Sequence, residues 1–85
     1  MRVSLMIKSR LKPLILEYNA RRVRSGQRPV SIRDFAASAS LSPSVITGLN
    51  SGRARRIDFE TMNKLCSVLS CQPGDLFEHI PDETA

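Results

Sequence analysis

The chain has 85 residues, of which 13 are Lys or Arg, 8 are Asp or Glu and 41% are hydrophobic. This length predicts one domain over residues 1–85 with one modest core, and it disfavours an enzyme because a deep catalytic cleft needs a larger core. The apolar runs are far shorter than the roughly 20 residues that span a bilayer, and no cleavable targeting segment is indicated. A cytoplasmic protein is therefore expected.

The net charge of +5 is divided unevenly along the chain. Residues 1–56 carry twelve basic side chains against Glu17 and Asp34, a net of +10, whereas residues 57–85 carry Lys64 against six acidic side chains, a net of −5. Basic side chains gathered in one part of a chain indicate a polyanionic partner, because they displace the counterions condensed on phosphates. The alternative is a solvated surface whose charge keeps the protein soluble.

The first predicted element is an amphipathic helix. Its apolar residues follow the i, i+3, i+4, i+7 spacing of one helical face: Leu11, Leu14, Ile15 and Tyr18. We expect the helix to start near Lys8, to continue to Arg24 and to stop at Gly26. The arginines of residues 19–28 either extend a phosphate-binding surface or solvate this helix.

Two short helices are predicted next. Ser31 and Asp34 form a capping pair for a helix over 32–39, whose apolar face holds Phe35, Ala36 and Ala39. Pro43 opens a further helix, which runs to about residue 50 and ends before Gly52. We expect a larger side chain at position 36 to push the second of these helices outward, because the two helices cross closely there.

A fourth helix begins after Asp58, its predicted N-cap, and one more helical turn is expected over 73–77. The apolar stripe of this fourth helix is predicted to be core: Phe59, Met62, Leu65, Cys66 and Leu69. Residues 79–85 form an acidic tail. The alternation of Val3, Leu5 and Ile7 also permits a two-stranded pairing of residues 2–7 with residues 76–80. The fold class is therefore all-α, with four to five helices and room for this short pairing.

The two short helices of residues 31–51 are joined by about three residues, which is the helix-turn-helix arrangement. Residues 31–53 closely resemble the motif of phage repressor and Cro-like (XRE-like) regulators, in their small single-domain branch: SIRDFAASASLSPSVITGLNSGR. The continuation is similar to the fourth helix and C-terminal segment of that family: DFETMNKLCSVLSCQPGDLFEHIPD. The resemblance covers residues 31–81 and implies a lambda-repressor-like DNA-binding fold. This chain has Ser40 where the family commonly has a left-handed glycine.

On this resemblance, the helix over 43–50 enters the major groove of duplex DNA. Its outward residues would face the bases: Pro43, Ser44 and Thr47. The residues facing phosphates would be Ser31 and Arg33 at the start of the preceding helix, with Asn50, Ser51, Arg53, Arg55 and Arg56 at and after the end of the groove helix. Hydroxyl groups can bond to base edges, and a Thr methyl can meet a thymine methyl. We expect a homodimer on DNA, because one short helix reads only a few base pairs.

Three functional hypotheses follow. The leading one is a DNA-binding transcriptional regulator. The alternative is a protein-interaction or antitoxin-like module that keeps the helix-turn-helix fold. RNA binding is weaker, because the four aromatic residues lie on predicted core faces. His79 has no neighbours at metal-ligand spacing, and Cys66 and Cys71 are interpreted as core thiols. No metal, cofactor, small-molecule ligand or membrane is expected as a partner.

Overall fold

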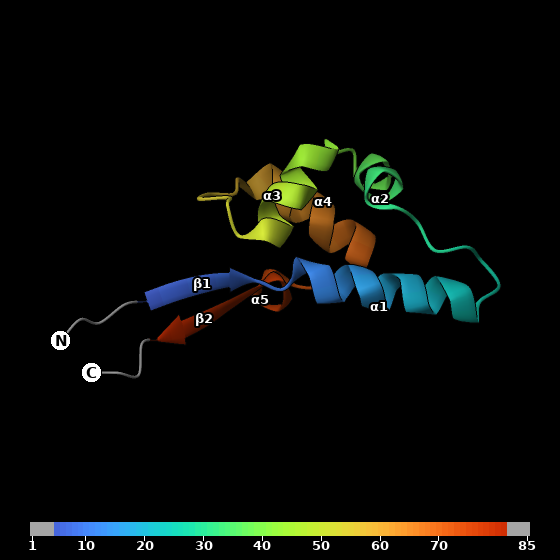
Figure 1. Ribbon diagram of the computed structural model, residues 1–85, viewed down its shortest axis with the longest axis horizontal. Coiled ribbons are helices and arrows are strands. Elements are labelled where there is room, and N and C mark those ends of the chain that lie inside the picture. The colour runs from blue at the N-terminus through green and yellow to red at the C-terminus, as the bar shows by residue number, and fades with distance from the viewer. Residues whose placement is uncertain (1–4, 82–85) are drawn as a thin grey trace.

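The computed structural model of the protein describes residues 5–81, with side chains from Met6 onward. In chain order its elements are β1 (Leu5–Ser9), α1 (Leu11–Arg24), α2 (Ile32–Ser38), α3 (Pro43–Ser51), α4 (Phe59–Leu69), α5 (Pro73–Leu76) and β2 (Phe77–Pro81). Helices α2, α3 and α4 pack above α1, and β1 and β2 form a ribbon that projects from one end of the helical body (Figure 1). The predicted all-α fold with a short pairing of strands is confirmed.

The ribbon is an antiparallel pair in which Leu5 lies opposite Pro81 and Ser9 lies opposite Phe77. It is shifted from the predicted ranges: β1 runs to Ser9, so α1 starts at Leu11 and not near residue 8. Strand β2 runs to Pro81, so the prediction of a tail over 79–85 is wrong for residues 79–81, whose backbone pairs with β1. Residues 2–4 of the predicted strand lie outside the described part. The base of the ribbon is half-buried at Ser9 and Phe77, while the part that projects from the helical body is open to solvent. Met6 and Ile7 are both more than half exposed, so strict alternation of apolar residues was never required.

The core joins one face of each helix. The residues buried in it are Leu11 and Ile15 of α1, Phe35 and Ala36 of α2, Ile46 and Leu49 of α3, Leu65 and Leu69 of α4, and Leu76 of α5. The rings of Tyr18 and Phe35 meet edge to face with centroids 5.5 Å apart, which ties α1 to α2. Within residues 5–81, no helix has the length and apolar character needed to cross a membrane.

The predicted helix ends are confirmed within about three residues. The Ser31 hydroxyl accepts a hydrogen bond from Asp34 N–H at 3.1 Å, and the Asp58 carboxylate accepts one from Thr61 N–H at 2.8 Å. Each bond satisfies an N–H group that the first turn of a helix cannot pair internally. At the other end of α3, Gly52 has φ 80°, a left-handed conformation that glycine adopts without strain.

The long connection between α1 and α2 is fastened to α1 by side chains. The amide of Asn19 donates to Val30 C=O at 3.1 Å and accepts from Val30 N–H at 2.8 Å. Nε of Arg22 donates to Arg28 C=O at 2.7 Å. These three bonds hold the extended segment that leads into α2, so Arg22 serves the connection.

The prediction that Phe59 belongs to the core is wrong, because this side chain is 88% exposed. Phe59 is the first residue of α4, and its neighbours Asp58 and Glu60 are also exposed. The first turn of α4 extends past the core, so a residue at the correct helical spacing finds no apolar partner there. The rest of the predicted stripe is buried or half-buried, from Met62 to Leu69.

Candidate nucleic-acid interface

Helices α2 and α3 are joined by a tight turn over residues 39–42. Leu41 N–H donates to Ala36 C=O at 2.8 Å, and Ser40 adopts φ 57°, the left-handed conformation that favours glycine. The ammonium group of Lys64 on α4 donates to Ser40 C=O at 3.2 Å. Ala36 is fully buried, as expected for a small residue where the two helices cross. The turn thus fixes the orientation of α3 relative to α2.

Helix α3 has one buried face and one exposed face. Ile46 and Leu49 are buried and anchor the helix in the core. The three residues predicted to face bases, Pro43, Ser44 and Thr47, are all exposed. They share the outward surface of the helix, as the helix-turn-helix prediction requires.

The hydroxyl groups on this surface have partners within the protein. Thr47 Oγ1 donates to the carbonyls of Pro43 and Ser44, both at 3.2 Å. Ser44 Oγ lies 3.1 Å from Ser42 Oγ, and Ser51 Oγ donates to Gly48 C=O at 3.3 Å. The outward surface of α3 therefore offers few free polar hydrogens.

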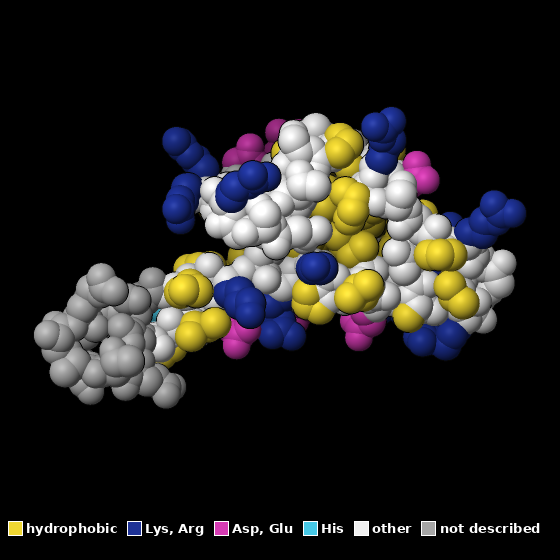
Figure 2. Space-filling view, in the orientation of Figure 1, with side chains coloured by type: hydrophobic (Ala, Val, Ile, Leu, Met, Phe, Trp, Pro, Cys, Tyr) yellow, Lys and Arg dark blue, Asp and Glu magenta, His cyan; other side chains and the backbone are white. Residues whose placement is uncertain are grey.

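An arginine-rich loop follows α3 and folds back beside it. Ala54 N–H donates to Gly48 C=O at 3.0 Å, so the loop path is fixed by a backbone bond to the helix. Arg53, Arg55 and Arg56 are exposed and form no salt bridge among residues 5–81. Figure 2 shows basic side chains standing out around this loop and beside α2.

The other predicted phosphate-facing residues lie at the start of α2 and at the end of α3. Ser31 and Arg33 are exposed at the start of α2, and the Ser31 hydroxyl keeps its own hydrogen because only its oxygen caps the helix. Ser51 accepts from Arg53 N–H at 3.4 Å and so orders the loop start. Asn50 is half-buried, and its Oδ1 has no hydrogen-bond partner in the described part of the chain.

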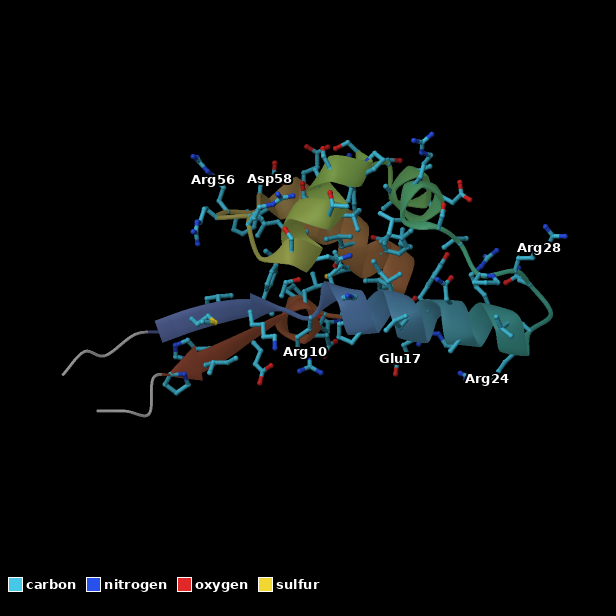
Figure 3. All side chains as sticks on the ribbon, in the orientation of Figure 1. Arg10, Glu17, Arg24, Arg28, Arg56 and Asp58 are labelled. Carbon is cyan, nitrogen blue, oxygen red and sulfur yellow. The ribbon has the colours of Figure 1, made fainter. Side chains whose placement is uncertain are left out.

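Charged side chains also project from the side of the molecule away from α3. Arg10, Glu17 and Arg24 project on the α1 side, whereas Arg56 and Asp58 project beyond the end of α3 (Figure 3). The basic half of the sequence is thus spread over more than one side of the fold.

Hydrogen bonds from the Thr61 hydroxyl and N–H hold the pKa of Asp58 below its usual 3.8. The residues described contain no cluster of side chains suited to a metal ion.

Two features of the interface carried no clear sequence signal. The two hydrogen bonds between the Asn19 amide and the backbone of Val30, here called the Asn19 clamp, hold the segment before α2 from eleven residues away, and no local pattern in the sequence indicates them. The Lys64 contact with Ser40 likewise joins α4 to the turn before α3. Both set the orientation of the helix pair from outside the motif itself.

Two short helices joined by a tight turn, the first anchored in the core by Phe35 and Ala36 and the second with one buried and one exposed face, form a helix-turn-helix, the arrangement of a class of DNA-binding domains. Residues 22–82 match the family described as the Cro/C1-type HTH DNA-binding domain, and the chain belongs to this family. The resemblance read from the motif is confirmed.

A curated relative is consistent with this family. The chain is 30% identical over 61 residues to the uncharacterized HTH-type transcriptional regulator YozG of Bacillus subtilis (strain 168), and the match covers 72% of this chain and 73% of the relative. No solved structure matches the chain significantly. The family and the relative together support a DNA-binding regulator.

Proposed function

We propose that the protein is a transcriptional regulator that inserts α3 into the major groove of duplex DNA. In this arrangement Pro43, Ser44 and Thr47 face the bases. The loop arginines Arg53, Arg55 and Arg56 contact phosphates on the flanking backbone, with Ser31 and Arg33 on the other side of the groove. The observation that carries the proposal is the exposed face of α3 beside three arginines that have no acidic partner within residues 5–81.

Phosphate binding predicts a strong dependence of affinity on salt. Four to six neutralised phosphates correspond to a slope of about −4 to −5 when the logarithm of the binding constant is plotted against the logarithm of salt concentration. Fluorescence anisotropy of a labelled duplex over a series of salt concentrations measures this slope. A slope near zero would contradict the proposal.

Charge reversal tests whether the loop carries the phosphate contacts. The variant with Arg53→Glu, Arg55→Glu and Arg56→Glu should bind duplex DNA much more weakly and reduce the salt slope by about three, one unit for each lost contact. The matched control reverses three charges on α1: Lys12, Arg21 and Arg24.

The control has the same net charge, but its substitutions lie on α1 and not among the residues proposed to contact DNA. Salt screens exposed charges over roughly 8–10 Å, so the control should keep most of its affinity. Circular dichroism checks that both variants fold. Equal losses of affinity in the two variants would reject the loop assignment, because net charge alone or phosphate contacts from the α1 arginines would then account for binding.

We further propose that the regulator binds as a homodimer. Helix α3 has nine residues and reaches few base pairs, so useful specificity needs two copies on a two-fold site. The ribbon is the candidate interface, with Met6, Ile7 and Ile80 exposed on it. Selection of bound sequences from a random duplex pool should enrich an inverted repeat. A single short site, with a monomer by light scattering on DNA, would reject the dimer.

The second candidate function is a protein-interaction or antitoxin-like module. The observation that favours it is the 88% exposed Phe59 beside the arginine-rich loop, because aromatic and arginine residues are enriched at protein interfaces. This candidate predicts that Phe59→Ser and charge reversal of the loop each weaken contact with an acidic partner, and that the natural protein binds no particular duplex sequence. Loss of duplex binding in the loop variant, with an intact fold, favours the regulator.

A further inference from the structure

The outward face of α3 carries hydroxyl groups but presents few hydroxyl hydrogens. Thr47 Oγ1 directs its hydrogen to helix carbonyls, at 3.2 Å from Pro43 O and 3.2 Å from Ser44 O. Ser51 similarly donates to Gly48 C=O. Of the two hydroxyls of Ser42 and Ser44, one donates to the other, so this pair keeps one free hydrogen. A Thr or Ser that is bonded back to its helix must break that bond before it can donate to a base.

The remaining groups on this face are mainly apolar. Pro43 presents a ring and has no N–H, and Thr47 is exposed with its hydroxyl bonded back to the helix, which leaves its methyl as the side-chain group available to a base. The helix has no exposed Arg, Lys, Gln or Asn from which a bidentate contact to a purine could be made; Asn50, its one amide side chain, is half-buried. Among the four bases, thymine alone displays a methyl group in the major groove, and apolar side chains recognise it by contact.

We infer that Thr47 is a specificity-determining residue that contacts the C5-methyl group of a thymine. It does so through its own methyl group and not through its hydroxyl. The inference rests on the proposed function, because it assumes that α3 lies in the major groove. The hydroxyl then has a structural role, because its bonds to Pro43 and Ser44 fix the orientation of the side chain.

Two substitutions separate the methyl from the hydroxyl. Thr47→Val keeps a methyl at this position and removes the hydroxyl, whereas Thr47→Ser keeps the hydroxyl and removes the methyl. The probe is the duplex enriched from a random pool, compared with versions in which each thymine in turn is replaced by deoxyuridine, which lacks only the C5-methyl group. Burial of one methyl group is worth about fourfold in affinity.

For the natural protein and Thr47→Val, replacement of one particular thymine should weaken binding about fourfold. For Thr47→Ser, binding to the thymine duplex should already be weaker by a similar factor, and deoxyuridine should cause no further loss. The losses are thus non-additive, which marks a direct contact between the two methyl groups.

Two results would overturn the inference while leaving DNA binding intact: no thymine whose replacement matters, or a loss of affinity in Thr47→Val that Thr47→Ser does not share. The second result would assign recognition to the hydroxyl. If no duplex is bound by the natural protein, the proposed function itself fails and this inference fails with it. The two failures are distinguished by the first binding measurement.

Discussion

The Asn19 clamp gives the sharpest stability prediction, because one side chain makes both bonds to the backbone of Val30. Asn19→Ala removes a donor to Val30 C=O and an acceptor from Val30 N–H, both partly buried. At about 0.5–1.5 kcal/mol for each bond, the loss is about 1–3 kcal/mol of unfolding free energy. Alanine recovers up to about 0.7 kcal/mol through its higher helix propensity. The expected net loss is about 0.3–2.3 kcal/mol.

Urea unfolding followed by far-ultraviolet circular dichroism measures this loss. The matched control is Asn63→Ala, an exposed asparagine inside α4 whose side chain makes no hydrogen bond to residues 5–81. It gains the same helix propensity without losing a clamp, so its stability should rise slightly. The difference between the two variants isolates the clamp. Equal stability of Asn19→Ala and Asn63→Ala would refute the reasoning.

Three further predictions concern backbone strain and titration. Ser40→Gly should raise the unfolding free energy by about 0.5–1 kcal/mol, because relief of the left-handed backbone strain exceeds the entropy that glycine adds to the unfolded chain. Gly52→Ala should lower the unfolding free energy, because alanine is strained in the left-handed conformation. Thermal unfolding of both variants checks the two signs. Burial raises the pKa of the Cys71 thiol from 9.0 to about 11, so its alkylation, followed by mass spectrometry, should keep accelerating between these pH values. Stability should fall over the same interval, because the unfolded chain releases the proton first. Asp58→Ala should lower the melting temperature and make it depend less on pH below about pH 5. The reason is that the lowered pKa of Asp58 stabilises the folded state above pH 3.8, and this stability is lost as the pH falls through the pKa of the folded state.

The local elements could be predicted from the sequence because their signals are local. Asp58 caps α4 by accepting a hydrogen bond from a residue three positions away. In α3 the buried residues Ile46 and Leu49 follow the spacing of one helical face. The exposure of Phe59 could not be predicted in this way, because it depends on where the first turn of α4 stands relative to the core. The clamp between Asn19 and Val30 depends on the path of the connection between them, and this path cannot be predicted from helical periodicity.

The same distinction applies to the interface. The sequence identified which α3 residues are outward, because Ile46 and Leu49 define the inward side. It did not reveal that Thr47 turns its hydroxyl back to the helix, because a threonine hydroxyl can bond either to its own helix or to another molecule. Only the side-chain geometry decides between these two states.

The backbone bond from Ala54 to Gly48 has a consequence for how this protein can evolve. The bond holds the loop against α3 without any arginine side chain, since Arg53, Arg55 and Arg56 form no salt bridge within the part of the chain described. Substitutions at these three positions can therefore change the number of positive charges while the loop keeps its path. If these arginines contact phosphates as proposed, related proteins can change their affinity for DNA one charge at a time while the fold of the loop stays the same.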